Sequence, residues 1–255
     1  MLTKTEAIVL RAIKYGESKL IADLFTREAG RVSFIITLPK TPRGGQKKQY
    51  FQPLTLVELE YDHRPKLQLQ KLGHIQLSTP YVTIPSKPEK LSIALFTAEF
   101  LYHALKGEQQ DAVLFDYIRF SMLWLDSCKT PVANFHLVFL MHMSRFLGFF
   151  PNLESHPAVH TSNSKPQQGA ADSYFDLRAA TFCHTVPVHH DFLMPAEAAH
   201  IRQLMRMDYA TMHLFRMTRQ ERGRIVEVLL LYYRLHLPDF PELKSLSVLQ
   251  ELYGT

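Results

Sequence analysis

LTLVELEY, residues 54–61, alternates almost perfectly and decides how the first third of the chain is interpreted. Every second residue from Leu54 would face one side of a strand, and every second residue from Thr55 would face the other. Strand-like segments with turn residues between them also occur at 5–10, 19–26, 31–38 and 66–75. Five short strands within 80 residues favour a small closed barrel, because closure leaves no strand edge free.

Prolines end the strand-rich part, at Pro80, Pro85 and Pro88, and the hydrophobic period that follows is helical. Six segments have this period and are predicted to be helices: 89–105, 111–126, 131–147, 195–207, 218–235 and 243–252. Residues 152–191 are polar, rich in histidine and poor in regular pattern. The sequence therefore predicts an α+β protein with a barrel domain at 1–80 and a helical domain at 81–255, in which 152–191 form an irregular insertion.

Positive charge is concentrated in the predicted barrel. The chain carries a formal net charge of +5, and residues 1–80 hold 13 Lys and Arg against 7 Asp and Glu. The remaining residues hold 16 basic and 17 acidic side chains, so all the excess lies in the first part. A basic domain joined to a near-neutral one indicates a polyanionic partner. Ordinary solvation of the surface is the alternative interpretation.

Other features narrow the class of protein. The two cysteines, Cys128 and Cys183, lie far apart and form no disulfide framework, so we expect a cytoplasmic protein. The N-terminus does not have the pattern of a signal peptide, and the apolar run near residues 135–150 is too short and too polar to span a membrane. No phosphate-binding loop, GxGxxG, GxSxG or HExxH motif occurs. These absences favour a binding protein over an enzyme.

Four segments together resemble the RecO family of recombination mediators: YGESKLIADLFTREAGRVS (15–33), FQPLTLVELEY (51–61), NFHLVFLMHMSRFLGFFPNLE (134–154) and LLLYYRLHLPDFPELKSLSVLQEL (229–252). The resemblance implies an N-terminal oligonucleotide-binding (OB) barrel followed by an α-helical domain. It implies binding to single- and double-stranded DNA, annealing of complementary strands, and work with RecR to load RecA onto gaps coated by single-strand-binding protein. It also implies binding to the acidic C-terminal tail of that coating protein, and a nucleoid-associated location. A protein–protein adaptor whose barrel is only a scaffold is the alternative.

The resemblance also raises the question of zinc, because many relatives carry two CxxC pairs in the helical domain. In this chain the corresponding places read SHPAV and FCHTV, so two of the four ligand positions are Val159 and Val186, beside His156 and Cys183. Two ligands do not make a structural zinc site, so we expect no zinc and no other cofactor. Four further histidines could substitute as zinc ligands, but their spacing matches no standard pattern: His160, His184, His189 and His190. A hydrolytic enzyme that uses the histidine-rich segment 156–190 with a metal is another alternative.

The DNA-binding prediction centres on the loop PKTPRGGQKKQ, residues 39–49. Its two glycines and four cations suit a phosphate backbone, although a solvated loop is the alternative. The basic residues of this loop are Lys40, Arg43, Lys47 and Lys48. Basic residues beside two other turns are predicted as further phosphate contacts: Lys14, Lys19, Arg27 and Arg31. Tyr50 and Phe51 could stack on bases, but Phe51 suits the core better.

A second predicted site would bind the acidic peptide tail in the helical domain. A terminal carboxylate needs Arg or Lys beside an apolar pocket. The predicted residues are Arg145, Phe149, Arg234, His236 and Lys244. Helix-end charges or surface ion pairs are the alternative for each cation. Arg219, Arg222 and Arg224 stand at a helix start, where the dipole disfavours cations unless an acidic partner meets them, and they could extend the DNA path.

Overall fold

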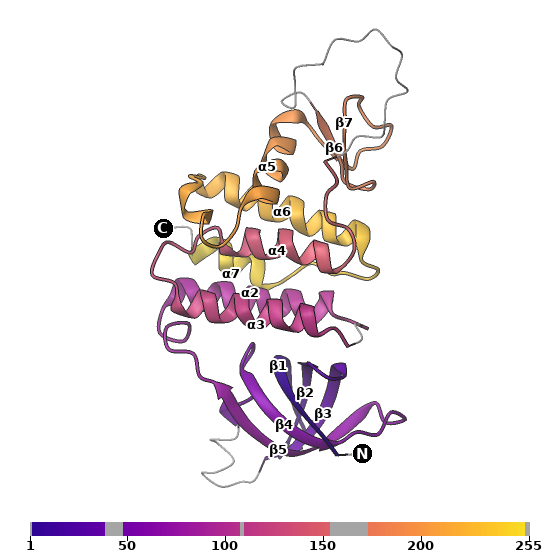
Figure 1. Ribbon diagram of the computed structural model, residues 1–255, viewed down its shortest axis with the longest axis vertical. Coiled ribbons are helices and arrows are strands. Elements are labelled where there is room, and N and C mark those ends of the chain that lie inside the picture. Colours follow the sequence, from indigo (N-terminus) through magenta and orange to yellow (C-terminus); the bar gives the residue numbers. More distant parts are fainter. Residues whose placement is uncertain (1, 39–47, 108–109, 154–172, 253–255) are drawn as a thin grey trace. The chain divides into compact units, whose positions relative to one another are not determined.

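The computed structural model describes residues 2–38, 48–107, 110–153 and 173–252 (Figure 1). They fall into two compact units. The first unit comprises Met1–Val132 and Leu243–Thr255, and the second comprises Ala133–Glu242. The predicted domain boundary at residue 80 stays a prediction, since the first unit combines strands and helices.

Five strands close into a barrel in the order β1-β2-β3-β5-β4. Their bounds are β1 Leu2–Tyr15, β2 Lys19–Thr26, β3 Gly30–Thr37, β4 Leu56–Asp62 and β5 Leu69–Thr79. The first half of β1 pairs with β4 and its second half with β2, which explains why β1 is longer than predicted. β5 pairs antiparallel with β4 and parallel with β3, and so closes the barrel. The predicted OB-type barrel followed by helices is confirmed.

The alternation of the deciding segment is visible in the barrel core. Val57, Leu59 and Tyr61 all point inward and are almost completely buried. Phe51 is 4% exposed and belongs to the same core, as expected. The predicted start of the strand at Leu54 is wrong by two residues. Leu54 has φ 63, a left-handed conformation that interrupts a strand, so β4 begins at Leu56.

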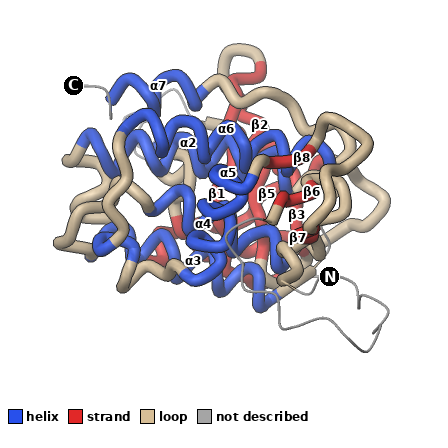
Figure 2. Tube along the Cα trace, turned by 90° about the horizontal axis from the view of Figure 1, so that it is seen from above, coloured by secondary structure: helices blue, strands red, loops and turns tan. Residues whose placement is uncertain are grey.

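Three helices complete the first unit: α2 Pro88–Ala104, α3 Ala112–Ser127 and α7 Ser245–Leu252. The Asp111 carboxylate caps α3 by accepting from two backbone N–H groups. The Lys90 ammonium lies in the interior and donates to the carbonyls of Asp126 and Cys128, at 2.9 and 2.8 Å, which ties α2 to the end of α3. α7 lies beside α2 (Figure 2), and the Glu99 carboxylate accepts from the Lys244 and Ser245 N–H groups at 3.0 and 2.7 Å.

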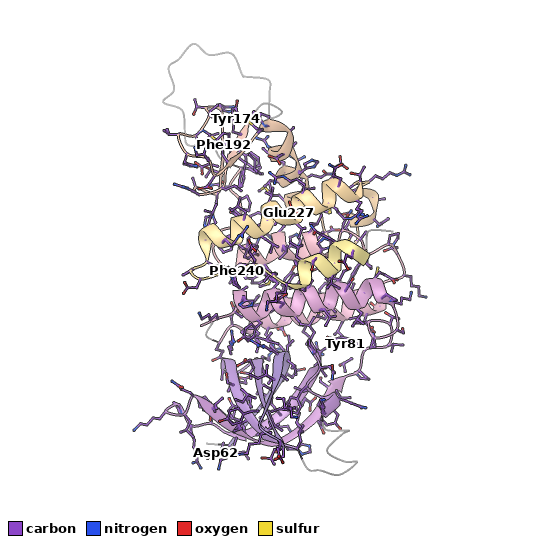
Figure 3. All side chains as sticks on the ribbon, turned by 180° about the vertical axis from the view of Figure 1, so that it is seen from behind. Asp62, Tyr81, Tyr174, Phe192, Glu227 and Phe240 are labelled. Atoms are coloured by element: carbon purple, nitrogen blue, oxygen red, sulfur yellow. The ribbon has the colours of Figure 1, made fainter. Side chains whose placement is uncertain are left out.

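The second unit contains α4 Phe135–Phe146, α5 Pro195–Arg206, a 3-10 turn at Met212–Leu214 and α6 Arg219–His236. The same unit also contains a three-stranded sheet in the order β7-β6-β8. Its strands are β6 Tyr174–Asp176, β7 Thr181–Cys183 and β8 Phe192–Leu193. The rings of Tyr174 and Phe192 meet edge to face, 5.9 Å apart, on this sheet (Figure 3).

The expectation of an irregular insertion at 152–191 is therefore wrong for the described residues from 173 onward. Strands of two or three residues are too short to show an alternating pattern in sequence. Their buried residues, Phe175, Phe182 and Leu193, are nonetheless apolar. Within the described residues, no helix combines the length and the apolar character that crossing a membrane requires.

Candidate nucleic-acid interface

Strand pairing places a row of side chains across the outside of the barrel. Ile13 of β1 pairs with Ile21 of β2, which pairs with Ile35 of β3, which pairs with Lys71 of β5. Directly paired residues point to the same side of a sheet. Ile13 is 43% exposed and Lys71 is exposed, whereas Leu20, the neighbour of Ile21 in sequence, lies in the core. The row therefore faces outward.

A second row continues the same face toward the β1–β2 turn. Tyr15 pairs with Lys19, and Lys19 pairs with Thr37. The Tyr15 side chain is 55% exposed. We call this face the outer strip and define it by six residues of the two rows: Ile13, Tyr15, Lys19, Ile21, Ile35 and Lys71.

The chemistry of the outer strip suits a single nucleic-acid strand. Neighbouring strands lie about 4.8 Å apart, so β1, β2 and β3 carry an aliphatic band of three isoleucines, with the Tyr15 ring two residues from Ile13 on β1. Lys71 borders the band on β5, Lys19 borders it on β2 two residues from Ile21, and neither lysine forms an ion pair with any residue that the structure describes. Base faces pack on apolar and aromatic side chains while ammonium groups hold phosphates.

The predicted DNA-binding lysines are distributed unevenly around this strip. Lys19 belongs to it, whereas Lys14 pairs with the core residue Leu20 and so lies at the barrel rim, on the other side of β1. Lys48 is exposed, and Tyr50 packs partly buried against the barrel core. The other three cations of the predicted loop lie outside the described residues: Lys40, Arg43 and Lys47.

Arg27 has partners within the chain. Its guanidinium forms a two-pronged pair with the Asp116 carboxylate of α3, with one contact at 2.8 Å, and lies 3.7 Å from the Glu6 carboxylate. Glu6 also lies 3.5 Å from the Arg119 guanidinium. Arg27 thus joins the barrel to α3, and its predicted phosphate contact stays a prediction.

Arg31 joins the barrel to α2 in a similar way. Its side chain is 15% exposed and donates to the Tyr102 carbonyl at 2.7 Å. The guanidinium also lies 4.4 Å from the centre of the Tyr102 ring, and that of Arg11 lies 4.9 Å from it. A guanidinium so engaged stabilises the fold. Its predicted phosphate contact stays a prediction.

Sequence reasoning predicted the two strands of the β4–β5 hairpin but missed its cations as candidate phosphate contacts. Its exposed cations are Arg64, Lys66 and Lys71. The sequence does indicate a basic surface here, because RPKLQLQK at 64–71 contains three basic residues and no acidic one. The loop at 39–49 is the stronger candidate in sequence because it has four cations and two glycines.

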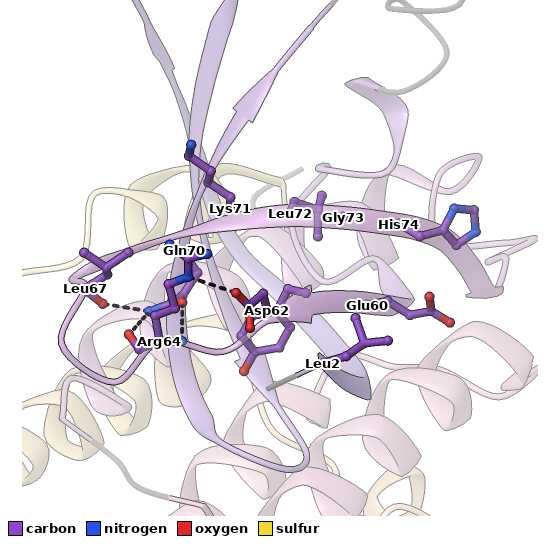
Figure 4. Close-up of a pocket in the computed structure, with 11 residues that line it drawn as sticks. Leu2, Glu60, Asp62, Arg64, Leu67, Gln70, Lys71, Leu72, Gly73 and His74 are labelled. Atoms are coloured by element: carbon purple, nitrogen blue, oxygen red, sulfur yellow. Dashed lines mark hydrogen bonds and ion pairs between the residues drawn. The ribbon is translucent and has the colours of Figure 1, made fainter.

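The hairpin borders a pocket of about 500 Å³ (Figure 4). Gln70, only 3% exposed, fixes the hairpin: its amide accepts from the Arg64 N–H at 3.0 Å and donates to the carbonyls of Arg64 and Leu67 at 2.8 and 2.7 Å. Gly73 forms a bulge in β5, since Leu72 pairs with Tyr61 and His74 with Glu60. A Cβ on Gly73 would lie 2.8 Å from the Glu60 carbonyl oxygen, which explains the glycine.

The predicted peptide site divides between the two units. Phe149 is 8% exposed and stacks on the His236 ring at 4.8 Å, and the His236 Nε2 lies 2.8 Å from the Leu177 carbonyl. Arg145 is exposed, 4.3 Å from the centre of the Phe150 ring. Arg234 pairs with Glu242 at 3.1 Å. Lys244 belongs to the first unit. The peptide site stays a prediction.

The arginines at the start of α6 meet acceptors of the chain itself. Arg224 pairs with Glu197 at 2.7 Å, and Arg222 donates to the Met217 carbonyl at 3.0 Å. Thr218 and Glu221 form a capping box, in which each side chain satisfies the backbone N–H of the other. The sequence analysis expected an acidic partner for these cations, and for Arg224 that partner is Glu197 of the chain itself.

His189, one of the histidines considered as metal ligands, has structural contacts. His189 lies 3.2 Å from the Asp176 carboxylate and accepts from the Asp191 N–H at 3.2 Å. Burial raises the pKa of the Cys183 thiol, which disfavours the thiolate that zinc requires. No three His, Cys, Asp or Glu side chains converge among the described residues. His156, Val159 and His160 lie outside those residues, and the expectation of no cofactor stays a prediction.

Comparisons with known proteins cover nearly the whole chain. Residues 1–81 match the family described as "Recombination protein O N terminal", and residues 85–247 match "Recombination protein O C terminal". A protein of Bacteroides fragilis named "DNA repair protein RecO" is 46% identical over 254 residues, which cover 99% of this chain and 100% of that one. A protein of the same name from Phocaeicola vulgatus is 46% identical over 100% of both chains. Another, from Porphyromonas gingivalis, is 34% identical over 99% of this chain and 100% of its own.

Proposed function

Because the chain belongs to the RecO family of DNA repair proteins, we propose that it binds single- and double-stranded DNA through the barrel and anneals complementary strands. The observation that carries the proposal is the outer strip, in which Lys19 and Lys71 border a half-exposed aliphatic band. The lysines would bind the phosphates of a strand while its bases pack on the aliphatic band. Duplex DNA, whose bases are stacked inside, would use the lysines alone.

We propose that the chain is a recombination mediator that binds DNA and proteins and catalyses no chemical reaction. We propose that the chain works with RecR to help load RecA onto gaps coated by single-strand-binding protein, in the cytoplasm and at the nucleoid. The acidic tail of the coating protein would bind near Arg145 and Arg234, whose guanidinium groups are both exposed in the second unit. Family membership and the chemistry of a terminal carboxylate support this part.

The test is the salt dependence of single-strand binding, measured by fluorescence anisotropy. Each phosphate contact contributes a slope of about −0.7 for single strands, so replacing Lys19 and Lys71 together by Ala should reduce the slope by about 1.4. Replacing Lys106 and Lys129 by Ala removes the same charge from exposed positions off the barrel and should leave the slope unchanged. Equal slopes for the two double variants would remove the outer strip from the DNA path.

One observation favours a second candidate, a protein adaptor. Ile13 and Leu69, which both lie on the outside of the barrel, are 43% and 37% exposed, and apolar surface also suits a protein partner. An adaptor would show negligible affinity for DNA even at low salt and would not anneal complementary strands. An annealing assay with and without coating protein separates the two functions.

A further inference from the structure

We propose that the pocket beside the β4–β5 hairpin binds one unstacked nucleobase that carries an exocyclic amino group. The base would belong to a single strand that lies on the outer strip. This inference rests on the proposed function and adds a base-selective position to a surface that otherwise binds without regard to sequence.

The pocket is adjacent to the outer strip and of suitable size. Lys71 lines the pocket and also belongs to the outer strip through its pairing with Ile35. In Figure 4 the Lys71 side chain points away from Glu60, so its ammonium can hold the backbone while the base enters the pocket. The volume of about 500 Å³ lies within the range of small-ligand pockets.

The pocket is preorganised by buried polar contacts. The Gln70 side chain makes three hydrogen bonds to the hairpin backbone and so fixes Arg64 and Leu67, both of which line the pocket. The bulge at Gly73 brings β5 against the Glu60 carbonyl. A rigid wall lowers the entropic cost of holding a ligand.

The lining groups select the base. Leu2, Leu67 and Leu72 supply apolar contact for the faces of a ring. The Glu60 carboxylate, 3.3 Å from the Lys4 ammonium, can only accept hydrogen bonds when ionised. Cytosine, adenine and guanine offer it an amino group. The single ring N–H of thymine lies between two carbonyl oxygens, which repel a carboxylate.

The experiment compares oligo-dC with oligo-dT of about 16 nucleotides, the upper site size of one such barrel. Binding is measured by anisotropy with the full chain, for the unmodified protein, Glu60→Gln and Glu58→Gln. Glu58 is the matched control, because it lies two residues away on β4, is also half-exposed, and contacts Gln76 outside the pocket. Both variants remove one negative charge, and circular dichroism checks their folding.

We expect the unmodified protein and Glu58→Gln to bind oligo-dC about fivefold more tightly than oligo-dT, the value of one net hydrogen bond. Glu60→Gln should bind both equally, since an amide donates and accepts. Equal binding by the unmodified protein, or loss of the preference in Glu58→Gln as well, would overturn the pocket while leaving the DNA-binding function intact. Failure to bind either strand at low salt would overturn the proposed function, and the pocket with it.

Discussion

At the scale of single residues, basic side chains beside similar turns have different surroundings. Lys19 and Arg31 both lie next to a β-turn and were equal candidates for phosphate contact. Lys19 lies on the outer strip without an ion-pair partner among the described residues, whereas Arg31 stacks on Tyr102 and donates to its carbonyl. The difference depends on a residue 71 positions away, which no local pattern reveals.

Arg31→Ala should therefore lower stability more than it weakens DNA binding. The loss of a partly buried charged hydrogen bond should cost about 1.5–3 kcal/mol in the free energy of unfolding, measured in urea. The salt slope of single-strand binding should hardly change. Lys19→Ala should behave oppositely, with a reduced slope and unchanged stability. If Arg31→Ala reduced the slope as much as Lys19→Ala, Arg31 would contact phosphate as first predicted.

His136 links stability to pH. Its burial in α4, with a smaller contribution from the charge of Arg222, lowers the pKa of the imidazole to about 3. As pH falls through the unfolded value near 6.5, the unfolded chain takes up a proton that the folded chain refuses. The stabilising effect is thus complete above about pH 6.5 and is lost progressively toward pH 3.

The expected result is a fall in the free energy of unfolding between about pH 7.5 and pH 5 that is roughly 2 kcal/mol larger for the unmodified protein than for His136→Gln. Urea unfolding at both pH values measures it, and all other titrating groups contribute equally to the two proteins. His190→Gln, at an exposed histidine, should retain the full dependence. An identical pH dependence in His136→Gln would show that the imidazole ionises normally.

At the scale of elements, short contacts at the ends decide where helices and strands begin. α6 begins at Arg219 because Thr218 and Glu221 satisfy each other's N–H groups. β5 changes partners between Lys71 and Leu72, from parallel β3 to antiparallel β4, next to the bulge at Gly73. The capping box and the bulge each involve only one or two residues, yet they determine where a helix begins and how a strand pairs.

Thr218→Ala should cost about 1 kcal/mol of stability, because it leaves a helix N–H without its acceptor. The measurement is the urea midpoint at neutral pH. Thr185→Ala changes an exposed threonine outside any helix or strand and should shift the midpoint little. Equal shifts for both variants would mean that the cap contributes nothing measurable.

The sequence predicted the elements better than the site. Alternation and helical period located all five barrel strands and the six long helices, because each pattern reflects a buried face within a few residues. The sheet at 174–193 was missed because its strands are too short to show a period. The outer strip depends on pairing between β1, β2, β3 and β5, so its lysines could be recognised as basic but not as neighbours. Lys71, 52 positions from Lys19, was overlooked for this reason.

At the scale of the whole molecule, the chain divides into two compact units, and buried apolar residues occur in both. The only tryptophan, Trp124, lies in α3 of the first unit. Its fluorescence therefore reports on that unit, whereas far-ultraviolet circular dichroism reports on the helices of both. The chain allows the two units to be followed separately without labels.

Leu137→Ala, which opens a cavity at a fully buried position of α4, should destabilise the second unit by about 2–5 kcal/mol. We expect an early transition by circular dichroism in urea, while the Trp124 fluorescence midpoint stays near that of the unmodified protein. Leu125→Ala, at a fully buried position of α3, should shift the fluorescence midpoint. Coincident transitions in Leu137→Ala would mean that the two units unfold as one.

The return of α7 to α2 has a consequence for biosynthesis. The ribosome releases Glu99 long before Lys244 and Ser245, whose N–H groups its carboxylate accepts. Every residue of Ala133–Glu242 is translated in between. Until α7 has been synthesised, the surface of α2 that packs against α7 stays uncovered in the nascent chain. A chaperone that shields this surface would therefore act during elongation rather than after it.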